Sequence, residues 1–87
     1  MNRVFVDITS DLSNVPNLEQ LLQEEHAVGG KWKAEGILEH LFVKDGAKGA
    51  ILVFQNIGID SLKQLIPKLP LHNYFVNVDY LLFDKIF

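Results

Sequence analysis

Hydrophobic residues alternate with more polar ones in several segments of this 87-residue chain. In the first of these segments, Val4, Val6 and Ile8 share one side of the extended backbone. A period of two is typical of a strand with one buried face, and the nearly unbroken apolar run at residues 50–55 is typical of a central strand covered on both faces. Together these patterns predict four strands, over residues 3–9, 37–44, 50–55 and 74–83.

Two other segments repeat apolar residues every three or four positions, as amphipathic helices do. The first predicted helix spans residues 18–35, and Glu25 falls on its buried stripe among leucines. The pair Gly29–Gly30 lies inside this helix, where each glycine costs about 1 kcal/mol relative to alanine. Either the helix breaks there or close packing requires small residues. A second helix is expected over residues 59–68.

The predicted elements follow the order strand, helix, strand, strand, helix, strand. With right-handed crossovers, this order gives a ferredoxin-like βαββαβ sheet of the α+β class, with strand order 4-1-3-2 and both helices on one face. We expect one domain over residues 1–87. The other face of the sheet would be bare in a monomer. Because 48% of the residues are hydrophobic, a homodimer or a larger ring is the simplest way to cover that face.

Composition and charge narrow the setting in which the protein works. The chain has no cysteine, which excludes disulfides and thiolate chemistry. Residues 1–7 lack the apolar core of a signal peptide, and no apolar run approaches the roughly 20 residues that cross a bilayer. We therefore expect a cytoplasmic protein without a membrane partner. The net charge of −3 argues against nucleic acid as a partner.

Several short blocks have a shared order and spacing: Lys33-Ala34-Glu35-Gly36, His40-Leu41-Phe42, Ile51-Leu52-Val53-Phe54, Lys68-Leu69-Pro70-Leu71, Tyr74 and Val78-Asp79. In this arrangement the chain resembles the muconolactone delta-isomerase family over roughly residues 22–82. The resemblance implies ferredoxin-like subunits that pair face to face as a dimeric α+β barrel. It also implies isomerisation of a lactone by proton transfer, without a metal or an organic cofactor.

One departure from the family pattern bears on the substrate. The residue before the strand histidine is basic in the family isomerase but is Glu39 here, and a carboxylate at that position would repel a carboxylate-bearing lactone. Two functions therefore stay open. The chain could bind and isomerise a small organic acid or lactone in an apolar cleft between the first helix and the sheet. Alternatively, it could be a non-catalytic dimeric module that binds a small molecule or acts as a scaffold.

Three residues are candidates for the proton transfer. Burial on the helix stripe would raise the pKa of Glu25, which suits a general base, although a helix-edge glutamate paired with a lysine is the alternative. His40 lies in the middle of a strand and could exchange a proton near neutral pH, or simply pack in the core or the dimer contact. The phenol of Tyr74 could stabilise an enolate-like oxygen, or it could fill the rim of the core.

Three further residues are candidates for ligand binding, because Glu39, Asn77 and Asp79 could face the interior of the barrel. Strict alternation puts Asn77 and Asp79 on one face of the last strand, and it places His40 beside Leu38 but Glu39 on the opposite side. The carboxylates could equally pair across the dimer with Lys44, Lys48 or Lys85. The three histidines lack the spacing of a metal site, and no glycine-rich phosphate loop is present.

Overall fold

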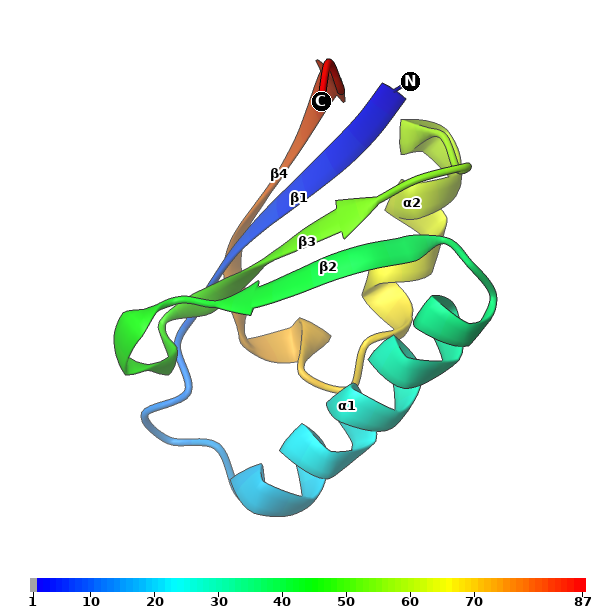
Figure 1. Cartoon of the computed structure of the whole chain (residues 1–87). Coiled ribbons are helices and arrows are strands. Elements are labelled where there is room, and N and C mark those ends of the chain that lie inside the picture. Colours follow the sequence, from blue (N-terminus) through cyan, green and yellow to red (C-terminus); the bar gives the residue numbers. More distant parts are fainter. Residues whose placement is uncertain (1) are drawn as a thin grey trace.

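The strands form one antiparallel sheet, and both helices lie on the same side of it (Figure 1). The computed structural model describes residues 2–87. Within them, the sheet has four strands in the order β2-β3-β1-β4. The predicted strand order and the ferredoxin-like α+β class are therefore confirmed. The elements are β1 (Asn2–Ser10), α1 (Leu18–Ala34), β2 (Leu38–Val43), β3 (Gly49–Phe54), α2 (Ile59–Leu65) and β4 (Phe75–Asp84), with short 3-10 turns η1 (Asp45–Ala47), η2 (Ile66–Lys68) and η3 (His72–Tyr74).

The core lies between the sheet and the two helices. Val4, Val6 and Ile8 of β1 point to this side, as their alternation predicts, and pack with buried residues of β3 and α2. Trp32 of α1 is buried against Phe54, with ring centroids 5.7 Å apart. Burial of each large side chain contributes roughly 1.5–3 kcal/mol, so this layer supplies most of the stability of the fold.

Helix α1 runs without a break through Gly29 and Gly30. A Cβ atom added at Gly29 would lie 3.9 Å from Leu38 Cδ2, and one added at Gly30 would meet nothing within 4 Å. Both sequence-based explanations for the glycine pair are therefore wrong, because the helix continues and packing leaves room for a methyl group. In the described part of the chain, neither helix is both long and apolar enough to span a bilayer.

Helix α2 is shorter than predicted because Pro67 follows its last turn. The α-helical hydrogen bonding ends at Leu65, and the chain continues as the 3-10 turn η2, which contains Pro67. A proline inside a helix removes one backbone donor and clashes with the preceding turn. The segment then places Leu69 and Leu71 in the core, each only 5% exposed.

A β-bulge in β2 changes which side chains face the helices. Leu38 pairs with Phe54 and His40 pairs with Val53, so Glu39 is an extra residue without a partner in β3. After the bulge, Leu41 faces the helix side, whereas Glu39 and His40 both lie on the other side. The expectation from strict alternation, which separated Glu39 from His40, is therefore wrong.

The face of the sheet away from the helices carries apolar side chains that no segment of the described chain covers. Phe5 and Phe83 pack edge to face, with ring centroids 4.8 Å apart. Phe42, Leu81 and Phe83 remain 59%, 45% and 47% exposed. We call this surface the open face of the sheet.

Gly49 at the start of β3 gives the first test of the fold. It has a φ of 153°, and a Cβ atom there would lie 1.9 Å from the carbonyl oxygen of Ile8. We expect Gly49→Ala to lower the free energy of unfolding by at least about 2 kcal/mol, because the β1–β3 pairing must shift. Gly30→Ala is the matched control and should raise the free energy of unfolding by about 1 kcal/mol. Urea denaturation measures both, and an unchanged Gly49→Ala protein would contradict the strand pairing.

Candidate ligand-binding site

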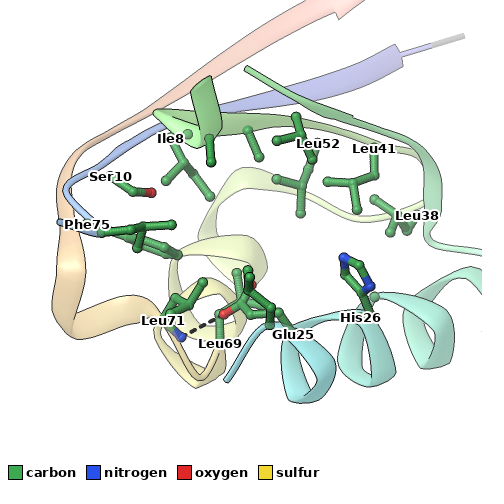
Figure 2. A pocket seen from close by; sticks show the side chains of 17 residues that line it. Ile8, Ser10, Glu25, His26, Leu38, Leu41, Leu52, Leu69, Leu71 and Phe75 are labelled. Atoms are coloured by element: carbon green, nitrogen blue, oxygen red, sulfur yellow. Dashed lines mark hydrogen bonds between the residues drawn. The ribbon is translucent and has the colours of Figure 1, made fainter. Parts of the chain in front are cut away.

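A cavity of about 100 Å³ lies between α1, the helix-facing side of the sheet and the segment that leads into β4 (Figure 2). Its wall is almost entirely apolar. An enclosed apolar cavity of roughly 150 Å³ can hold a benzene molecule. This cavity is smaller but opens to solvent, so it suits a small ring of which part projects out of the cavity. The sheet contributes Ile8, Leu38, Leu41, Ala50 and Leu52, the segment before β4 contributes Leu69, Leu71 and Phe75, and α1 contributes Leu22, Glu25, His26 and Gly29.

Glu25 is the carboxylic acid in this wall. Its Oε1 accepts a hydrogen bond of 2.7 Å from the backbone N–H of Leu71 (Figure 2). Burial raises the pKa of Glu25, and the Leu71 N–H and the nearby His26 offset part of that rise. A carboxyl group with a raised pKa can both accept and return a proton close to neutral pH.

His26, the next residue on α1, also lines the cavity and lies at the opposite end from Phe75 (Figure 2). His26 was not among the site residues predicted from the sequence, because adjacent helical residues point about 100° apart and Glu25 was the candidate on this helix. The cavity is wide enough to take both side chains. The signal was present in the spacing, because Leu22, His26 and Gly29 follow the i, i+4, i+7 pattern of one helix face. Ser10, at the Phe75 end, is a second lining residue that the sequence analysis missed.

A second hollow, of about 280 Å³, adjoins the cavity at the outer edge of β2. The two spaces share four wall residues, His26, Gly29, Leu38 and Leu41. The second hollow is otherwise lined by Gly30, Lys33, Glu39 and His40. The ammonium group of Lys33 donates a hydrogen bond of 3.1 Å to the backbone carbonyl of Glu39.

Glu39 is held by cations on the open face of the sheet. The guanidinium of Arg3 donates two hydrogen bonds to its carboxylate, of 2.8 and 3.1 Å, and Lys85 lies 3.5 Å away. The bond from Arg3 holds the pKa of Glu39 well below its usual range, at about 2. Glu39 therefore pairs with Lys85 within its own chain, whereas the alternative predicted a pair across the dimer, and Arg3 is the stronger partner. Its charge lies outside the cavity and is balanced.

The other predicted residues lie away from the cavity. Asn77 donates a hydrogen bond of 2.9 Å to Asp79, and both are exposed on the open face. Asp79 lies opposite Asp7 across the β1–β4 pairing. Tyr74 ends η3 and is not part of the cavity wall. Of the three predicted catalytic residues, Glu25 alone lines the cavity, while His40 lines the second hollow. The structure thus does not bring Glu25, His40 and Tyr74 together.

Residues 2–87 contain no group of three or more histidine, aspartate or glutamate side chains arranged to hold a metal ion. The polar chemistry of the cavity wall comes from Glu25, His26 and Ser10. Such a wall can bind an apolar ring, hydrogen-bond an oxygen and move a proton.

No family model and no curated protein matches the chain. Among solved structures, it is similar to a crystal structure of muconolactone isomerase, with a TM-score of 0.76 and 21% sequence identity. The match covers 95% of this chain and 88% of the isomerase chain. At this identity the likeness establishes the fold. The protein has a ferredoxin-like α+β fold, and the fold is that of muconolactone isomerase, which confirms at this level the resemblance seen in the short sequence blocks.

The Arg3–Glu39 ion pair predicts how the stability of the folded chain depends on pH. Because the pKa of Glu39 is about 2 in the folded chain against an ordinary 4.5, the unfolded chain binds more protons between these values. The stabilisation is therefore complete above about pH 4.5 and is lost as the pH falls toward 2. Melting temperatures of Glu39→Gln should fall less over this range than those of the wild type. The exposed control Glu24→Gln should follow the wild type, and parallel curves for wild type and Glu39→Gln would contradict the pair.

Proposed function

We propose that this chain is a muconolactone-isomerase-like protein that binds a small organic acid or lactone in the cavity under α1, where Glu25 transfers a proton beside the carbonyl group of the ligand. The observation that carries the proposal is a half-buried carboxyl group, with a raised pKa, in the wall of an otherwise apolar cavity. The fold shared with muconolactone isomerase supports it.

The proposed reaction moves a double bond within an unsaturated lactone. In α-angelica lactone the Glu25 carboxylate removes a proton from the carbon next to the carbonyl, whereas in muconolactone, whose ring double bond already lies beside the carbonyl, it removes the proton from the ring carbon that bears the carboxymethyl arm. In both cases the C–H electron pair moves toward the carbonyl group, a dienolate forms, and negative charge collects on the carbonyl oxygen. The protonated Glu25 then returns the proton two carbons further along, so that the product is an isomer of the substrate. His26 lines the same wall and is the proposed hydrogen-bond donor to the charged oxygen. Tyr74, predicted for that role, lies outside the wall.

One observation favours the non-catalytic alternative. Glu25 already accepts the Leu71 N–H, and this bond ties α1 to the segment between η2 and η3. A buried backbone donor needs such a partner, so Glu25 also has a structural reason to be there. In this alternative the cavity binds the same class of ligand without turning it over.

The open face supports a proposal of self-association. Its exposed Phe42, Leu81 and Phe83 surround the balanced Arg3–Glu39 pair. A second copy of the chain, or a larger ring of dimers, would remove these side chains from water. We propose that the protein works in this assembled form.

The chemistry is tested with butenolides, the five-membered unsaturated lactones. α-Angelica lactone and muconolactone are incubated with the protein in D2O, and NMR follows deuterium uptake and isomer formation. Glu25→Gln should lower the rate at least 100-fold, because general acid–base catalysis contributes about 10²–10⁴-fold. The wild-type rate should rise with pH through a pKa above the ordinary 4.5 of a glutamate.

Glu24→Gln is the matched control, since Glu24 is exposed and absent from the cavity wall. Equal rates for the wild type and Glu25→Gln would refute the mechanism. Tight binding without turnover would establish the non-catalytic alternative, and neither binding nor turnover would remove the proposed function.

Self-association is tested by sedimentation velocity at micromolar concentration. The wild type should sediment as a dimer or larger species, and Phe83→Asp should sediment as a folded monomer because it places a charge in the apolar patch. Leu82→Asp is the control, since Leu82 is also exposed but pairs with Val4 and so points to the other side of β4. A folded wild-type monomer under these conditions would exclude the proposed assembly.

A further inference from the structure

We propose that Gly29 is a specificity-determining residue, which keeps a passage open between the cavity and the second hollow for a ligand that consists of a small ring and a short polar arm. This inference rests on the proposed function of the cavity. It concerns the absence of side chains at Gly29 and Gly30 in α1, which neither the fold nor the proposed proton transfer explains.

The first argument is that folding does not require glycine at this position. Gly29 lies inside an unbroken α-helix, where alanine is the more stabilising residue. A Cβ atom at Gly29 would make only an ordinary contact with Leu38 Cδ2, at 3.9 Å. The φ of Gly29 is not positive, so an alanine could adopt the same backbone conformation. The glycine therefore lowers helix stability without a compensating contact in the folded chain.

The second argument is the position of Gly29 between two spaces. It lines both the cavity and the second hollow, together with His26, Leu38 and Leu41. A side chain at residue 29 would point toward Leu38 and narrow the opening between the two. The bulge at Glu39 helps to form this opening, because it turns Leu41 toward the cavity while His40 stays at the edge of the second hollow.

The third argument is the chemistry at the two ends of the passage. The cavity is apolar and suits a compact ring. The second hollow has the basic side chains of His26, Lys33 and His40, while the acidic Glu39 is neutralised by Arg3. Lys33 Nζ now donates to a backbone carbonyl, so it can exchange that bond for one to a ligand. The arm should therefore end in a hydrogen-bond acceptor such as a carbonyl or a carboxylate.

Two lactones with the same α,β-unsaturated ring test the proposal. β-Angelica lactone carries a methyl group, and muconolactone carries a carboxymethyl arm. Dissociation constants are measured by NMR titration for the wild type, Gly29→Ala and the control Gln23→Ala, which favours the same helix at an exposed site. Gly29→Ala should melt at a higher temperature than the wild type, weaken muconolactone binding at least tenfold and change angelica lactone binding less than threefold.

The outcomes separate this inference from the proposed function. If Gly29→Ala is more stable and both lactones bind as they do to the wild type, the proposed role of Gly29 is overturned while the cavity remains a binding site. If Gly29→Ala weakens both lactones equally, the residue limits the ring rather than the arm, and the passage is refuted. If neither lactone binds the wild type, the proposed function fails and the role of Gly29 fails with it.

Discussion

The alternation of side chains along β1 is the constraint on which the rest of the structure depends. Val4, Val6 and Ile8 must lie on one side of the strand, and this forces Arg3, Phe5 and Asp7 to the other. Because β1 lies between β3 and β4, its side chains occupy the central part of both faces of the sheet. One face makes the core and the cavity under α1. The other carries an apolar patch and an ion pair, and no segment within residues 2–87 covers it.

The cavity exists because the side chains of the helix layer cover the helix-facing side of the sheet unevenly. At one end of the helix layer, Trp32, Leu62 and Ile66 fill the space over the sheet completely. In the middle of α1, Glu25, His26 and Gly29 stand where large apolar side chains would fill the layer, and the layer does not close. A carboxyl group in such a place is destabilising when ionised, because burial raises its pKa. The hydrogen bond from Leu71 and the nearby His26 offset only part of that effect, so the pKa of Glu25 stays above its ordinary value.

Much of the fold could be predicted from the sequence, because it depends on local periodicity. The strands and helices, their order and the strand arrangement all follow from periods of two and of three to four residues. Glu25 was recognised because a charged residue on a buried stripe is conspicuous. The paired charge of Glu39 could not be predicted, because its partner Arg3 lies 36 positions away in the sequence.

The bulge at Glu39 could not be predicted either, because it arises from pairing between β2 and β3 and has no local signature in the sequence. His26 was missed for another reason. Its spacing from Leu22 fits the helix face, but its neighbour Glu25, a carboxylate among leucines, was the more conspicuous residue. Both errors concern the site rather than the fold. A site depends on the direction in which single side chains point, whereas the fold depends on the periodicity of apolar residues along whole strands and helices.

The bulge also affects how this chain should be compared with its structural relatives. One extra residue in β2 reverses the facing of every side chain that follows it in the strand, from His40 to Val43. A protein without that residue would present the opposite set of side chains to its cavity, even where an alignment shows the same amino acids. Equivalent positions in this strand are therefore best matched by their pairing with β3, and residue identity alone is a poor guide to shared chemistry.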